Sequence, residues 1–356
     1  MLRKIRAICL VTVITISLFE GAIAASFYFP KVWQLSPNPF IAQKLYRSQR
    51  NIVQLMPECA EHDGQLGYIN RLGRCEFSNY EFDTTIIVGE SGRLSLKEPK
   101  PYLDDYDCNV VFLGDSLTYG WGVEQKETFS HLVGKKLGCK VFNLGVSSYG
   151  TARQVIDLNR RGIIKTDVPT HIFLQYCDND LKENSAFKQH DGSLPTMSER
   201  QYKDLVASYE DRIKYYFPKY LWVLSERVFQ RISEGFHSST DCLKNCGEQG
   251  SVDAPENAEV DAFLYALSKL EFDKVKPTFT IFELNGTNRN DCNFSDAVHK
   301  NLAGIKTVLG DRVSILSTCG VLTSDDYFVL DDHMNARGHA KFSDFVLENI
   351  GAVVKK

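Results

Sequence analysis

The sequence predicts an α/β fold, a doubly wound three-layer α/β/α sandwich. Two observations predict it. Short apolar segments alternate along the chain with stretches that have helical spacing. Residues 110–113 are apolar without alternation, as expected for a strand that is buried on both faces of a parallel sheet. With 356 residues and 43% hydrophobic residues, the chain is long and apolar enough to bury a sizeable core.

Five segments have the composition of buried strands. They are residues 110–113, 140–144, 171–176, 278–284 and 312–316. Helical spacing of apolar residues occurs between them, as at residues 127–137. We therefore expect a five-stranded, mostly parallel sheet with the flavodoxin-like strand order, covered by helices on both faces.

The first 24 residues have the pattern of an export signal. Basic residues among the first six precede an apolar, uncharged run from Ala7 to Phe19, and Ala22-Ile23-Ala24 offers a small-x-small cleavage site. The run is short for a membrane-spanning helix, which favours a signal peptide cleaved after Ala24 over an uncleaved anchor. Both alternatives place the remainder outside the cytoplasm, secreted or periplasmic, with membrane contact only through such an anchor.

The remaining chain divides into an extension and a main domain. Residues 25–107 are expected to form a small β-rich extension that packs on the main domain, because large aromatic side chains such as Phe77 and Phe82 indicate burial. Residues 108–356 form the main domain. Within it, residues 181–276 are too many for an ordinary crossover and are a candidate lid or substrate wall.

Ten cysteines in an exported chain predict disulfides. The local pairs to test are Cys59/Cys75, Cys242/Cys246 and Cys292/Cys319. Cys108 and Cys177 adjoin predicted core strands and are candidates for buried thiols. The sequence alone leaves the connectivity open.

Polar motifs follow the first three predicted strands, and another lies near the C-terminus. They are Gly114-Asp115-Ser116-Leu117, residues 143–150, Cys177-Asp178-Asn179-Asp180, and residues 331–338. Taken alone, the first motif could be a turn in which Asp115 or Ser116 merely caps the next helix. Ligands of open α/β sheets bind beyond the carboxyl ends of the strands, so four such motifs in order indicate one functional site.

These four blocks resemble those of the SGNH/GDSL hydrolases, and the resemblance covers residues 109–350. It implies that Ser116 is the nucleophile and His333 the general base. It also implies an oxyanion hole that includes the backbone N–H of Ser148 and the side-chain amide of Asn179. Ser148 and Cys177 stand where the family usually has glycine.

The acid of the implied triad has two candidates. The family usually places it three residues before the histidine, but that position is Leu330. Asp331 and Asp332 are the alternatives, and Asp331 is preferred because some family branches have the spacing Asp-x-His. A carboxylate on one imidazole nitrogen fixes the tautomer, while the other nitrogen takes the serine proton.

The resemblance implies a serine esterase that hydrolyses an acyl ester through an acyl-enzyme on Ser116. The partner would be an acylated small molecule, lipid or glycan, and deacetylation of an extracellular glycan is the first substrate hypothesis. One alternative is an O-acyltransferase for a surface polysaccharide that uses the same triad, and another is an inactive glycan-binding protein with this fold. No metal or cofactor motif is found, the net charge of −4 gives no reason to expect nucleic acid, and the oligomeric state stays open.

Overall fold

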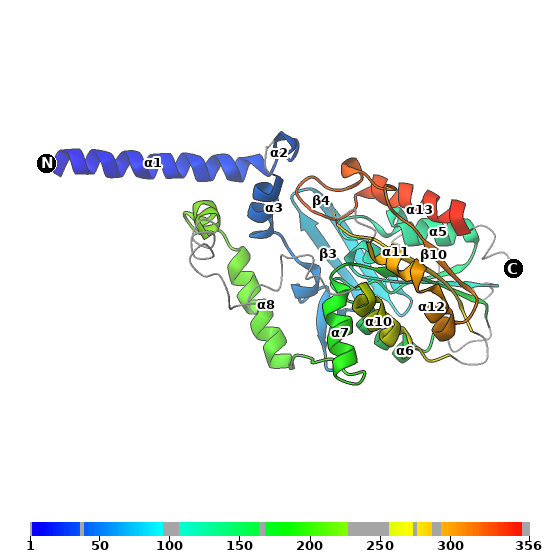
Figure 1. The fold of residues 1–356 in the computed structure, drawn as a ribbon. Helices are drawn as coiled ribbons and strands as arrows, with labels where there is room; N and C mark the ends of the chain where they lie inside the picture. The colour runs from blue at the N-terminus through cyan, green and yellow to red at the C-terminus, as the bar shows by residue number, and fades with distance from the viewer. Residues whose placement is uncertain are drawn as a thin grey trace.

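The computed structural model describes residues 2–35, 39–94, 107–163, 168–226, 256–272, 276–286 and 293–350. Its centre is a mixed, mostly parallel sheet whose strand order is β10-β9-β8-β6-β7-β5-β4-β3 (Figure 1). The five expected strands form its parallel part, and they are β6 (Asn109–Leu113), β7 (Lys140–Asn143), β8 (Thr170–Tyr176), β9 (Thr278–Glu283) and β10 (Val313–Leu316). Their order is that of a flavodoxin-like sheet.

The sheet has eight strands, so the expectation of five was wrong. The three additional strands come from the N-terminal region: β3 (Gly73–Asn79), β4 (Phe82–Gly89) and β5 (Gly92–Leu94). The β3/β4 and β4/β5 pairs are antiparallel, and β5 joins β7 through the pair Gly92–Asn143. Gly92 has a φ of +87° and lies directly against the Asn143 carbonyl, so a side chain there would prevent the junction. Composition alone does not reveal a junction that depends on one backbone contact.

Helices cover both faces of the sheet, which makes three layers (Figure 1). Alternate residues of β6 face opposite ways: Val111 and Leu113 join one core, and Val110 and Phe112 join the other. The helices of the first core are α6 (Thr151–Arg161), α10 (Glu256–Leu267), α11 (Asn293–Lys300) and α12 (Leu302–Leu309). Those of the second are α5 (Phe129–Leu137) and α13 (Ala336–Ile350).

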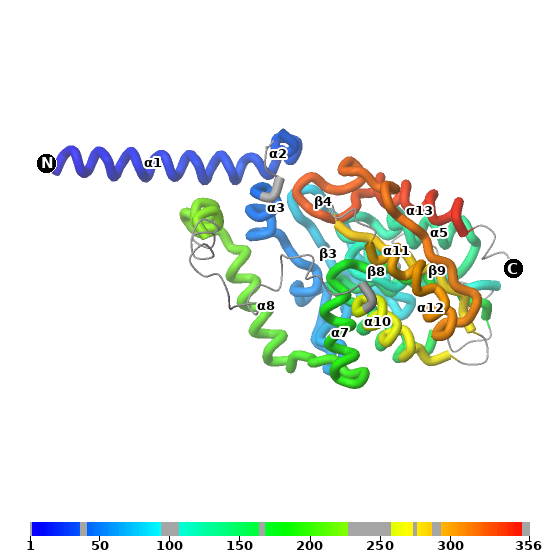
Figure 2. Tube along the Cα trace, in the orientation of Figure 1, coloured from blue at the N-terminus to red at the C-terminus, as the bar shows by residue number. Residues whose placement is uncertain are grey.

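The N-terminal helix α1 (Leu2–Ser26) extends away from the rest of the molecule (Figures 1 and 2). It is long and apolar enough to cross a membrane, with a mean hydropathy of 2.1 over its most apolar window. A helix of this kind at the N-terminus fits either a signal sequence or an anchor. Two short helices follow, α2 (Lys31–Gln34) and α3 (Pro39–Arg47), and α3 leads back to the domain.

The long insertion begins with α7 (Asp180–Gln189) and continues through α8 (Glu199–Ile213) to a helical segment at residues 219–226. The part of the candidate lid at residues 227–255 lies outside the described residues. A separate two-stranded sheet, β1 (Ala60–Asp63) and β2 (Gly67–Asn70), lies in the N-terminal region.

The described residues contain a disulfide in the N-terminal region and another in the main domain. The expected Cys59–Cys75 bond is present. Cys108 is bonded to Cys139, which corrects the expectation that Cys108 is a buried thiol: both cysteines adjoin neighbouring parallel strands, and their Cα atoms lie 4.9 Å apart. Cys177 is a free, buried thiol. Cys319 is disulfide-bonded, whereas Cys292, Cys242 and Cys246 lie outside the described residues.

Candidate active site

The strand β6 delivers Ser116 to the carboxyl edge of the sheet. It ends at Leu113, and helix α4 (Ser116–Tyr119) begins three residues later. The Asp115 side chain accepts a hydrogen bond from the Leu117 N–H, so the capping expected of this motif does occur. Capping by Asp115 therefore leaves Ser116, the first residue of α4, able to bond to groups outside the helix.

The neighbouring strand β8 fixes this turn through Gln175. Its amide N–H donates to Asp115 Oδ1 at 2.8 Å, and its carbonyl accepts from Thr118 Oγ1 at 2.6 Å. Gly114 packs against both Gln175 and Thr118, which leaves no room for a larger residue. Burial raises the pKa of the Asp115 carboxyl.

Ser116, His333 and Asp331 form a continuous chain of hydrogen bonds. Ser116 Oγ lies 2.7 Å from His333 Nε2, and His333 Nδ1 lies 2.5 Å from Asp331 Oδ1. Because an ionised Asp331 can only accept, Nδ1 carries the imidazole proton and Nε2 is left to accept the serine hydroxyl proton. The fold thus joins two groups that are 217 positions apart in the sequence.

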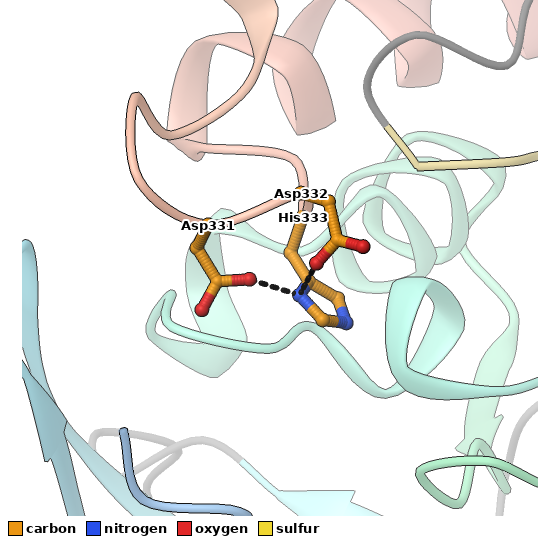
Figure 3. Close-up of side chains that lie close together, drawn as sticks. All are labelled: Asp331, Asp332 and His333. Atoms are coloured by element: carbon orange, nitrogen blue, oxygen red, sulfur yellow. Dashed lines mark hydrogen bonds and ion pairs between the residues drawn. The ribbon is translucent and has the colours of Figure 1, made fainter. Parts of the chain in front are cut away.

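Asp332 also approaches the histidine, as Figure 3 shows, but its geometry is weaker. Its Oδ1 lies 3.5 Å from His333 Nδ1, and its side chain is 28% exposed, whereas the Asp331 side chain is fully buried. Asp332 also bonds to Arg47 at 2.9 Å, on the solvent side. Of the two candidates, Asp331 has the closer contact with the imidazole.

Asp331 accepts hydrogen bonds from four groups. Oδ1 accepts from His333 and from Arg50 at 3.0 Å, and Oδ2 accepts from the Tyr46 hydroxyl at 2.9 Å and from the Trp121 indole N–H at 3.2 Å. Burial alone would raise the pKa of this carboxyl, but the charges of Arg50 and His333, with the hydrogen bonds, hold it well below its usual range. Asp331 is therefore a carboxylate at neutral pH.

Trp121 also orients the histidine ring. The indole and imidazole rings are stacked, with centroids 4.5 Å apart and planes 11° from parallel. The Arg50 guanidinium carbon lies 5.4 Å from the Trp121 ring centroid, within the range of a cation–π contact. The imidazole is thus held by the stacked indole ring, by the hydrogen bond that Nδ1 donates to Asp331 and by the one that Nε2 accepts from Ser116.

The backbone before Asp331 is held by Glu81, in the turn between β3 and β4. Its carboxylate accepts from the N–H groups of Val329, Leu330 and Asp331 at 2.7, 2.7 and 3.1 Å. Burial raises the pKa of Glu81 despite these three hydrogen bonds. The N-terminal hairpin therefore determines where the aspartate loop lies.

Asp331, Asp332 and His333 offer atoms within 4.8 Å of one another, a spacing that a metal ion could use. Arg50 bonds to both carboxylates, at 3.0 and 3.4 Å, and Arg47 bonds to Asp332. The negative charge of this cluster is therefore compensated by two guanidinium groups of the chain itself.

Ser148 and Asn179 lie on loops at the same edge of the sheet as Ser116. Ser148 follows β7 and Asn179 follows β8, and both strands flank β6. Ser148 adopts a φ of +62° and is held by Gln54, which donates to its hydroxyl at 3.1 Å, and by Arg153, which donates to its carbonyl at 3.0 Å. Asn179 stands at the N-terminal cap position of α7.

Sequence reasoning missed four residues that surround Asp331: Tyr46, Arg50, Glu81 and Trp121. Trp121 carried a weak signal in the sequence, because it lies between two glycines shortly after Ser116. The other three lie in the N-terminal extension, where no local pattern distinguishes them from surface polar residues. The pairing of β5 with β7 and the shared core of Phe77 with Trp121 bring that extension to the site.

Comparisons with known proteins find resemblance at the level of structure only. No family model and no curated protein matches the sequence. The similar solved structures include a lipolytic protein of the G-D-S-L family from Veillonella parvula, with 12% identity, a TM-score of 0.36 and coverage of 69% of this chain and 99% of that one. They also include a carbohydrate esterase family 2 enzyme with a carbohydrate-binding domain from Corynascus thermopiles (Myceliophthora fergusii), with 11% identity, a TM-score of 0.41 and coverage of 74% and 70%.

A third similar structure is the lipase Lip_vut3 from a goat rumen metagenome, with 15% identity, a TM-score of 0.34 and coverage of 69% of this chain and 99% of that chain. The structural neighbours are thus lipolytic proteins of the G-D-S-L family, a lipase and a carbohydrate esterase.

Proposed function

We propose that this chain is a serine esterase in which Ser116 is the nucleophile, His333 the general base and Asp331 the acid of the triad. The observation that carries the proposal is the hydrogen-bonded chain from Ser116 Oγ through the imidazole to the buried Asp331 carboxylate. A serine hydroxyl becomes an effective nucleophile when a base within hydrogen-bond reach removes its proton.

The reaction has two halves. Ser116 Oγ attacks the acyl carbonyl while His333 Nε2 takes its proton, and the ionised Asp331 stabilises the resulting imidazolium. The tetrahedral intermediate then collapses: the bond to the alcohol oxygen breaks, the imidazolium protonates that oxygen, and an acyl-enzyme remains. Water attacks the acyl-enzyme with the same base, releasing the carboxylic acid and the free serine.

Negative charge develops on the carbonyl oxygen in both halves. We assign its stabilisation to the backbone N–H groups of Ser116 and Ser148 and to the side-chain amide of Asn179. The support is their position on three neighbouring strand ends, with the Ser148 loop fixed by Gln54 and Arg153. A donor of this kind typically lowers the barrier by about 3 kcal/mol.

The substrate class is an acyl ester outside the cytoplasm, and O-acetylated glycans are the substrates to test first. The test is hydrolysis of p-nitrophenyl acetate, butyrate and octanoate by the full-length protein in detergent, beside Ser116→Ala and His333→Ala. Ser78→Ala is the matched control, because Ser78 is exposed on β3. We expect both site variants to lose at least about 10³-fold in kcat/KM and the control to keep its activity. Turnover that survives in Ser116→Ala would refute the proposal.

A further inference from the structure

Large apolar side chains gather where α1 joins the domain. They belong to two segments, one directly after α1 and one after α8, and each is between 38% and 85% exposed. We call them the exit patch: Tyr28, Phe29, Val32, Leu35, Tyr215, Tyr216, Phe217, Leu221 and Trp222. Large apolar side chains that are exposed near one another indicate an interaction surface.

The two segments of the exit patch are joined through Glu20 of α1. Its side chain is 2% exposed, although most of α1 is bare. Its carboxylate accepts from the backbone N–H groups of Tyr220 and Leu221 at 3.1 and 2.7 Å, and from the Tyr215 hydroxyl at 3.0 Å. Those N–H groups open the helical segment 219–226, so Glu20 serves as the cap of that segment. Figure 2 shows this segment beside the end of α1.

The end of α1 is also part of the domain core. Phe27 is fully buried, with its ring centroid 5.2 Å from that of Tyr80 and 5.9 Å from that of Tyr220. The same cluster contains Tyr46 and Leu330, the residue before Asp331. A continuous set of contacts therefore connects α1 to the aspartate of the candidate site.

The part of α1 before Glu20 is suited to lipid. Its apolar side chains point outward, and the hydroxyls of Thr12 and Thr15 donate to the Ile8 and Val11 carbonyls at 2.9 Å, which satisfies them without water. Arg3, Lys4 and Arg6 stand at the opposite end from the domain, as the positive-inside rule requires of a helix with its N-terminus in the cytoplasm.

We propose that α1 is retained as a membrane anchor and that the exit patch lies in the outer interfacial layer of the same bilayer. Cleavage after Ala24 would remove the Glu20 cap and leave the buried Phe27 near a new terminus. The occupant of the patch is lipid, because α1 brings the bilayer to it, and Tyr and Trp are the side chains that favour this layer.

Trp222 tests the position of the patch independently of any esterase activity. The probe is the full-length protein in phosphatidylcholine vesicles whose acyl chains carry bromine either near the head group or near the chain end. The emission of Trp222 is taken as the difference between wild type and Trp222→Phe. We expect bromine near the head group to quench this emission at least about twofold more than bromine near the chain end does. Equal emission in brominated and unbrominated vesicles would overturn the membrane contact.

Retention of α1 is tested on protein extracted from membranes. We expect its intact mass to include residues 1–24, and a chain that begins at Ala25 would overturn the proposal. Glu20→Ala should raise the rate of proteolysis between residues 215 and 226 about fivefold through loss of the cap, whereas Glu210→Ala, an exposed carboxylate on α8, should leave it unchanged. Equal rates in the two variants would show that Glu20 does not cap this segment and would overturn the proposed attachment of α1 to the exit patch.

Discussion

Replacing Asp331 by asparagine tests whether Asp331 or Asp332 is the acid of the site. All four groups that contact Asp331, from His333, Arg50, Tyr46 and Trp121, are donors. Each oxygen of Asp331 accepts from two of these donors. Asparagine has only one acceptor oxygen, so its NH2 group would face the two donors that contacted the oxygen it replaces. At least two buried donors would lose their acceptor, at about 1–3 kcal/mol each in stability. The imidazolium would also lose its counter-charge, so we expect kcat to fall about 10⁴-fold, equivalent to about 5.5 kcal/mol of barrier.

Asp332→Asn is the matched control. Its carboxylate is 28% exposed and lies 3.5 Å from the imidazole nitrogen, so its loss should cost at most about 1 kcal/mol, or about fivefold in rate. The measurement is kcat and KM for p-nitrophenyl acetate with both variants, beside thermal unfolding to verify that each is folded. A fall for Asp332→Asn as large as that for Asp331→Asn, or a folded Asp331→Asn with more than a tenth of the activity, would show that Asp331 is not the acid of the triad.

Three further predictions concern stability and positioning. Trp121→Phe keeps the ring that stacks on His333 but removes the N–H donated to Asp331, so urea unfolding should show a loss of about 1.5–3 kcal/mol; no loss would mean that this hydrogen bond is not formed. The pKa of Asp331 is lower in the folded than in the unfolded protein, so its contribution to the free energy of unfolding is complete above pH ~4 and declines as pH falls further. The free energy of unfolding, measured across the acid range, should decline less steeply for Asp331→Asn than for wild type. Parallel curves would contradict the depressed pKa. Replacing Cys59 and Cys75 by alanine opens a loop with a sequence separation of 16, and unfolding free energy should fall by about 3 kcal/mol; an unchanged value would exclude a stabilising role for that bond.

The parallel half of the fold could be predicted because buried strands have a strong local signature. The uninterrupted apolar run before Gly114 indicated a strand buried on both faces, and β6 is such a strand. The contact of Ser116 with His333 was expected for the same reason, since motifs at the ends of parallel strands converge at one edge. Their catalytic roles stay a proposal.

The surroundings of Asp331 could not be predicted. Arg50 and Glu81 are ordinary polar residues in sequence, and their effect depends on how the N-terminal region packs beside the parallel strands. Cys108 illustrates the same limit: its position beside a core strand suggested burial, but only the pairing of β6 with β7 brings Cys139 within bonding distance.

The junction of Gly92 with Asn143 has a consequence for any attempt to shorten this protein. A fragment that starts at residue 107 would remove the strand that pairs with β7 at Asn143 and would leave backbone groups at that edge available to other copies of the chain. We expect such a fragment to self-associate as well as to lose the residues that hold Asp331. The minimal soluble unit therefore includes the N-terminal hairpin, and a library of truncations should find no soluble boundary between β5 and β6.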